Sequence, residues 1–150
     1  MDKQRLSLLN YSITGLVIVL ILLMFFKLTQ DSDIAFTRRV LAELVNGRQS
    51  AEQAIDWPHF LALGSDIGAD YSRFLIEPQR QYYRKAFIIN FSMTFKNVGG
   101  QLNSFTNWRI YNRDNTKTVI SCLALNNKAL LFTLSKKNGK RKLASIQWKE

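Results

Sequence analysis

One apolar run near the N-terminus dominates the pattern of hydrophobic and polar positions. Residues 6–26 carry no charge, and Arg5 and Lys27 bracket them. At about 1.5 Å of rise per residue, a helix of this length is roughly 31 Å long, which matches a hydrocarbon core of about 30 Å. The run therefore predicts an uncleaved transmembrane helix over residues 6–28, preceded by a short cytoplasmic tail, residues 1–5. The residues expected to form its membrane anchor are Leu16, Val17, Ile18, Val19, Leu20, Ile21, Leu22, Leu23, Met24, Phe25 and Phe26.

Two other interpretations of this run fit less well. A helix that is apolar on every side would need a larger domain to bury it. A cleaved signal peptide would need a small-x-small site after the run, and the sequence has none there. Basic residues flank the run on both sides, so the positive-inside rule does not decide the orientation. The short tail favours a single-pass protein of a bacterial inner membrane, with its domain facing the periplasm.

The next part of the chain has helical spacing. Residues 29–33 are a polar linker that ends in Asp33, a residue type suited to cap a helix. Apolar residues then recur every three or four positions over residues 34–46, which predicts a helix. Shorter helices are predicted around residues 50–53, where Ser50 and Gln53 stand as in a capping box, and over residues 66–76.

Residues 79–98 fit two structures. Phe87, Phe91 and Phe95 stand four apart, which makes a helical stripe, whereas the alternation of apolar and polar residues from Ile89 onward is typical of a strand. The Pro start and the scarcity of β-branched residues favour the helix, although both interpretations stay open.

After Gly100 the pattern changes to short alternating segments separated by turn residues. Asn138 and Gly139 form the strongest of these turn signals, because Asn-Gly suits a two-residue hairpin. Strands are predicted at residues 104–111, 116–125, 129–134 and 143–148. The fold class is therefore α+β: a transmembrane helix, then several helices, then a curved antiparallel β-meander, with one extracytoplasmic domain over residues 34–150.

The closing segments, residues 131–140 and 143–148, pair a lysine-flanked Asn-Gly turn with a final strand that ends in an aromatic residue. Together with the preceding helices, this pattern resembles the nuclear transport factor 2-like (cystatin-related) cone fold. A short tail, one span and such a cone also resemble the assembly-factor subunit of bacterial type IV secretion systems. The resemblance implies a cone-shaped domain, and it transfers no interaction site, because a fold does not determine a function.

Composition narrows the chemistry. One Cys and one His exclude a disulfide framework, a Cys-rich zinc site and a multi-histidine metal site. His59 is better explained as a surface residue and Cys122 as a small buried hydrophobe than as catalytic groups. Asp residues at predicted helix starts are explained by capping. No phosphate loop or nucleophile motif is present, so we expect no catalytic residue, no metal and no cofactor.

The formal net charge of +10 is concentrated near the predicted Asn-Gly turn. A basic interaction surface is predicted there, formed by Lys136, Lys137, Lys140, Arg141 and Lys142. Anionic lipid headgroups or an acidic protein suit this surface better than nucleic acid, because no stacking or helix-reading motif accompanies it; a solvated turn is the alternative. If the cone holds a pocket, Tyr83 and Trp108 are the residues expected in its wall.

These observations favour a non-enzymatic single-pass membrane protein. Its domain would serve as a binding, scaffolding or assembly module in a membrane protein complex such as a secretion system, or in a homo-oligomer. The first alternative is a membrane-anchored domain that binds a small molecule or lipid in the cone, which requires a cavity. The second alternative is an enzyme of the same fold, which requires an ionisable residue inside the cone.

Overall fold

The computed structural model describes residues 2–124 and 126–149, and it describes the side chains of residues 14–25 and of residues 32 onward within those ranges. The chain divides into two units, Met1–Ser32 and Asp33–Glu150. The second unit begins one residue before the domain predicted at residues 34–150.

The second unit combines helices with a six-stranded sheet. The α-helices are α1 (Asp2–Val45), which runs from the first unit into the second, α2 (Ile67–Ser72) and α3 (Glu77–Asn97). Three short 3₁₀ helices are η1 (Gln49–Ala54), η2 (Trp57–His59) and η3 (Leu102–Ser104). The strands are β1 (Leu61–Ala62), β2 (Ser65–Asp66), β3 (Thr106–Arg113), β4 (Lys117–Leu123), β5 (Ala129–Lys137) and β6 (Lys140–Trp148). The α+β class predicted from the pattern is confirmed.

The predicted transmembrane helix is wrong for the part of the chain that the structure describes. No helix within that part is long and apolar enough to cross a membrane. Phe26, the last residue of the predicted anchor, and the predicted tail at residues 1–5 lie outside the residues with described side chains. The predicted periplasmic location depended on the span and stays a prediction.

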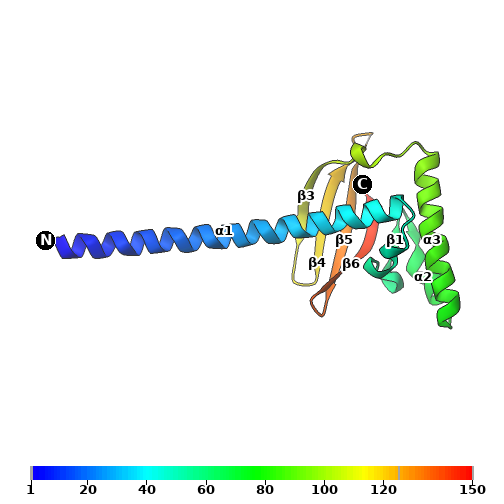
Figure 1. Ribbon diagram of the computed structural model, residues 1–150, viewed down its shortest axis with the longest axis horizontal. Coiled ribbons are helices and arrows are strands. Elements are labelled where there is room, and N and C mark those ends of the chain that lie inside the picture. The colour runs from blue at the N-terminus through cyan, green and yellow to red at the C-terminus, as the bar shows by residue number, and fades with distance from the viewer. Residues whose placement is uncertain (1, 125, 150) are drawn as a thin grey trace. The chain divides into compact units, whose positions relative to one another are not determined.

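The sheet is mixed, which corrects the predicted antiparallel meander. Its order is β2-β1-β6-β5-β4-β3 (Figure 1), and β1 pairs in parallel with β6 while the other neighbours are antiparallel. The parallel pair is extended by Leu63, whose backbone N–H donates to the carbonyl of Ile146 at 2.7 Å. β1 and β2 have two residues each, which is too short for an alternating pattern that a sequence could reveal.

The predicted turn between the last two strands is confirmed. Asn138 and Gly139 connect β5 to β6, and their φ angles are +51° and +73°. Positive φ at both central residues defines a type I′ turn, whose twist matches that of the flanking strands. The register that follows pairs Lys137 with Lys140 and Lys136 with Arg141 across the hairpin.

Residues 79–98, for which the sequence left two structures open, belong to helix α3. Pro78 stands in its first turn, where the missing N–H costs nothing. Phe87 and Phe91 lie one turn apart with ring centroids 6.0 Å from each other, as the helical stripe requires. On the same helix Ser92 is buried and donates its hydroxyl to the carbonyl of Val45 at 2.7 Å, which ties α3 to the end of α1.

Alternate residues of the central strands form the core. Ile120 of β4, Phe132 and Leu134 of β5 and Ile146 of β6 are almost fully buried. They face the C-terminal part of α1, where Leu44 is buried in the same cluster. Phe132 also stacks on Trp108 of β3, with ring centroids 5.4 Å apart.

Successive residues of a strand point to opposite faces of the sheet. Substitutions at two neighbouring positions of β5 therefore test which face is buried in the core. We expect Phe132→Ala to lower the free energy of unfolding by about 3–5 kcal/mol, since it empties a fully buried site. Leu131→Ala, on the partly exposed face, is the control and should cost clearly less. Urea denaturation of the full chain measures both; equal losses would contradict this assignment of the faces.

Candidate functional site

An apolar cavity of about 410 Å³ lies between helix α3 and the sheet. Its lining comes from Leu41 of α1, Phe91 and Phe95 of α3, and Leu130 and Ile146 of the sheet, among others. The residues around its mouth include Leu63, Val98 and Trp148, all of them exposed. Every lining residue is uncharged, so the cavity suits an apolar occupant and offers no group for acid–base or metal chemistry.

One wall of the cavity depends on a close approach of the backbone after α3. Gly99 has a φ of +73°, and a Cβ on Gly100 would lie 2.7 Å from the ring and the carbonyl of Phe95. The chain therefore turns tightly over Phe95 into η3 and places Phe105 on that ring, with centroids 6.0 Å apart. Phe95 and Phe105 both border the cavity.

Tyr83 and Trp108, the two residues predicted for a pocket wall, lie elsewhere. Tyr83 packs against Phe74, with ring centroids 5.3 Å apart, and burial raises the pKa of its hydroxyl. Trp108 donates its indole N–H to the carbonyl of Phe105 at 3.0 Å. Tyr83 borders a hollow of about 560 Å³ and Trp108 one of about 360 Å³, and neither borders the cavity described above. The aromatic residues that do border it are Phe91, Phe95, Phe105 and Trp148.

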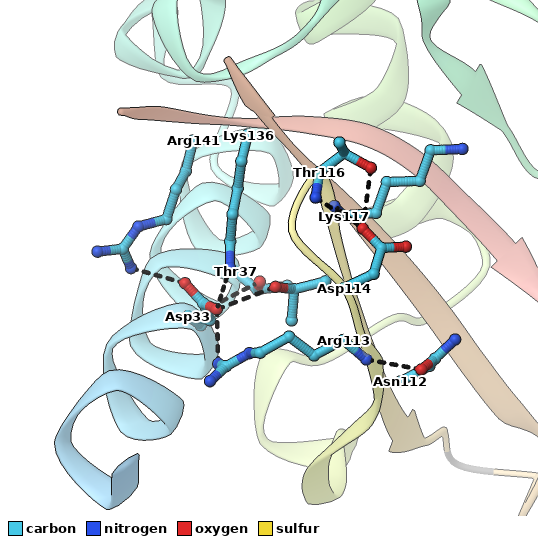
Figure 2. Close-up of polar contacts among 10 residues, drawn as sticks. Asp33, Thr37, Asn112, Arg113, Asp114, Thr116, Lys117, Lys136 and Arg141 are labelled. Atoms are coloured by element: carbon cyan, nitrogen blue, oxygen red, sulfur yellow. Dashed lines mark hydrogen bonds and ion pairs between the residues drawn. The ribbon is translucent and has the colours of Figure 1, made fainter. Parts of the chain in front are cut away.

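The second feature of the domain is polar. It surrounds Asp33, at the end of the strands opposite to the apolar cavity (Figure 2). This residue of α1 is 1% exposed, and its carboxylate accepts hydrogen bonds from Arg113 at 2.7 Å and Arg141 at 2.8 Å. The ammonium group of Lys136 lies 3.7 Å away. The hydroxyl of Thr118 donates to the same carboxylate at 3.1 Å. One side chain of α1 thus contacts one residue from each of β3, β4, β5 and β6.

Three positive charges surround this one negative charge. The cations stay partly accessible: the side chains of Arg113, Lys136 and Arg141 are 20%, 28% and 35% exposed. Among the described side chains, the cluster therefore has two more positive than negative charges, next to water. Such an arrangement can hold anionic groups from outside the domain, because guanidinium and ammonium donors recognise carboxylate and phosphate oxygens.

The sequence located part of this cluster and missed its centre. Lys136 and Arg141 belong to the predicted basic surface, and the structure directs both at Asp33. Lys137, Lys140 and Lys142, the other three members, are exposed. Asp33 itself was expected to cap a helix, but it lies inside α1. Its partners Arg113 and Arg141 stand 80 and 108 positions away, so no local pattern reveals the contact.

Replacing Asp33 removes the negative charge that the described residues place among these cations. We expect Asp33→Asn to lower the free energy of unfolding by about 2–4 kcal/mol. This loss is smaller than that for a fully buried ion pair, because water can still solvate the cations that lose their partner. Added salt should restore part of this stability by screening the repulsion that remains. Urea denaturation at low and high salt measures both effects.

The matched control is Asp70→Asn, which breaks the exposed ion pair between Asp70 and Arg73. Exposed pairs contribute little, so this variant should lose less than about 1 kcal/mol. If the two variants lost equal stability, Asp33 would not have the role described.

His59, Asp56 and Ser135 lie close together without forming a nucleophilic triad. The Asp56 carboxylate lies 3.3 Å from Nδ1 of His59, and it accepts a hydrogen bond from the Ser135 hydroxyl at 3.0 Å. In a triad the imidazole must contact the hydroxyl so that it can take its proton. Here the carboxylate stands between them, so this arrangement does not activate Ser135. Among the described residues, no group of three or more His, Cys, Asp or Glu side chains suits a metal ion.

Cys122 lies in the core on β4, and it is 1% exposed. Burial raises the pKa of its thiol to about 12. Because the thiolate is the reactive form, this environment keeps the sulfur inert at neutral pH.

The thiol should therefore label slowly in the folded protein. Relative to an exposed cysteine with a pKa of about 8.5, the thiolate fraction at pH 8 falls by about three orders of magnitude. Reaction with iodoacetamide, followed by mass spectrometry, should show little modification of native protein and complete modification in guanidinium chloride. Rapid labelling of the native protein would contradict this burial.

No protein family, no curated protein and no solved structure matches this chain. The resemblances to the nuclear transport factor 2-like fold and to a secretion-system assembly factor thus find no counterpart in these comparisons. What the chain itself defines is an α+β domain with a mixed six-stranded sheet, an apolar cavity and a cationic cluster.

Proposed function

We propose that residues 33–150 form a non-enzymatic binding domain that holds a small apolar molecule in the cavity between α3 and the sheet. The observation that carries this proposal is the cavity itself, about 410 Å³ with an uncharged and largely apolar lining. Sites for small ligands usually measure about 300–1,000 Å³ and are lined mostly by hydrophobic and aromatic side chains.

Close packing elsewhere in the domain makes this cavity informative. Protein interiors are packed about as densely as organic crystals, so apolar side chains that border an open hollow lack contacts that a bound apolar molecule can supply. The cavity borders fully packed core residues such as Leu41 and Ile146, which are 2% and 1% exposed. An apolar ligand would restore those contacts and would also cover the exposed Trp148 at the mouth.

The polar atoms of the lining give the ligand few directional partners. Ser104 donates its hydroxyl to the nearby carbonyl of Gln101, and Asn126 accepts from the backbone N–H of Lys128 at 3.0 Å. These local bonds leave shape and apolar contact as the main basis of recognition. We therefore propose a hydrocarbon-like or aromatic ligand rather than a sugar, a nucleotide or an amino acid.

This proposal takes up the ligand-binding alternative, because that hypothesis required a cavity and a filled core would have opposed it. The scaffolding function predicted first needs no cavity. It depends on a protein partner, for which the cationic end of the sheet is the better candidate.

Binding can be measured with N-phenyl-1-naphthylamine, a neutral probe that becomes fluorescent in apolar surroundings. The full-length protein should bind it saturably. Thr94 is exposed on α3 and borders the cavity, so Thr94→Trp should fill the space without disturbing the core. We expect this variant to weaken probe binding about tenfold or more, which corresponds to about 1.4 kcal/mol.

The control is Met93→Trp, the same new side chain one position earlier. Met93 is 56% exposed and borders neither this cavity nor the two other hollows. It should leave probe affinity within about twofold of the parent. No saturable binding by the parent protein, or equal losses in the two variants, would refute the proposed ligand site.

A further inference from the structure

The cationic end of the sheet contains more than the cluster around Asp33. We define the basic hairpin surface as Lys136, Lys137, Lys140, Arg141 and Lys142, together with Arg113 at the end of β3. All but Arg113 lie on the β5–β6 hairpin, which projects beyond β4 in Figure 1. This surface is separate from the apolar cavity, and none of its residues borders that cavity.

The hairpin places like charges directly opposite one another. Lys136 pairs with Arg141, and Lys137 pairs with Lys140. Like charges at such positions destabilise a hairpin. Asp33 relieves the first pair, since it contacts both members. For the second pair, no described carboxylate lies within ion-pair distance, so its repulsion is unrelieved within the described structure.

The local acids do not balance the surface. Asp33 and Asp56 contact it or the adjoining Ser135, which leaves six basic residues against two carboxylates. Asp114 serves its own turn instead: it accepts the backbone N–H groups of Thr116 and Lys117, each at 2.7 Å (Figure 2). The bond from Thr116 contributes most to lowering the Asp114 pKa. Among the described side chains, the surface therefore carries four more positive than negative charges.

The three exposed lysines share one side of the hairpin. Lys140 and Lys142 stand two residues apart on β6, so both point to the same face, and Lys137 is paired with Lys140. Their spacing along the strand is roughly 6.6 Å, at about 3.3 Å per residue. An extended chain with a carboxylate at every second residue repeats at the same distance, so it would place successive acids beside successive lysines.

Other anionic partners fit this surface less well. Proteins that bind single-stranded nucleic acid stack its bases on aromatic side chains, and residues 133–142 contain no aromatic residue. Surfaces that enter a lipid interface insert apolar side chains, but the hairpin tip is Asn138–Gly139. Carboxylates on a flexible segment need neither, because charge and spacing suffice.

We propose that the basic hairpin surface is a docking site for an acidic, extended segment of a partner protein. Asp33 fixes Arg113, Lys136 and Arg141 on one side, while Lys137, Lys140 and Lys142 meet the acidic side chains on the other. This proposal does not depend on a ligand in the cavity.

The test measures binding of a fluorescein-labelled peptide of alternating Glu and Ser residues to the full-length protein, by fluorescence anisotropy at 50 mM salt. We expect saturable binding that weakens at higher salt, because the contacts are exposed charges. The combined variant Lys137→Gln, Lys140→Gln, Lys142→Gln should bind about tenfold more weakly or worse. It should also unfold no more easily than the parent, since it removes the like-charge pair.

The matched control removes the same total charge outside the basic hairpin surface: Lys85→Gln, Lys96→Gln and Lys128→Gln, all exposed. Lys128 precedes β5 at the end opposite to Lys137. This variant should lose less than threefold in affinity. Equal losses in the two triple variants would mean that only net charge matters and would overturn the proposal. No peptide binding at 50 mM salt would also overturn it.

Two further probes separate the classes of partner. A labelled oligothymidylate of equal charge and vesicles that contain phosphatidylglycerol are titrated under the same conditions. We expect both to bind more weakly than the peptide. If either bound more tightly and depended on the same three lysines, the surface would serve nucleic acid or lipid, and the acidic-protein proposal would be wrong.

Discussion

The contact on which the domain most depends is the burial of the Asp33 carboxylate against the sheet. A charge leaves water at high cost, and only ion pairs and hydrogen bonds of good geometry compensate for it. Asp33 obtains these from Arg113, Thr118, Lys136 and Arg141, one from each of the four long strands. The need to pair this buried carboxylate therefore fixes the position of α1 along the sheet. It also fixes the relative register of strand ends that lie far apart in sequence.

This anchor divides the sheet into two ends of different chemistry. β5 starts at Ala129 beside the cavity, where Leu130 is part of the lining, and it ends at Lys137 among the cations. Along α1, Asp33 and Leu41 are separated by about 12 Å of helix, at about 1.5 Å per residue. One helix thus supplies the buried acid for the cationic end and an apolar wall for the cavity. The two proposed binding sites share a scaffold but no residue.

Features that depend on residues close together in the sequence could be predicted, whereas features that depend on contacts between distant residues could not. The Asn138–Gly139 turn was predicted, and a helix was favoured over a strand for residues 79–98, because φ preferences and the spacing of Phe87, Phe91 and Phe95 act within a few residues. The parallel pairing of β1 was not, since two residues carry no periodic signal. The transmembrane helix predicted over residues 6–28 was also wrong, since no helix within the described residues is long and apolar enough to cross a membrane.

The binding residues illustrate the same limit in a different way. A run of lysines is visible in any sequence, so the basic surface was predictable, but its organisation was not. Asp33 looked like a helix cap because capping is the usual role of an aspartate before an apolar periodic segment. In the folded domain Asp33 is instead the counter-charge of Lys136 and Arg141. Lys137, Lys140 and Lys142 remain exposed to solvent. A single buried acid can therefore permit a hairpin to carry more positive charge than its own strands would tolerate. The unbalanced remainder is then available to a partner rather than to the fold.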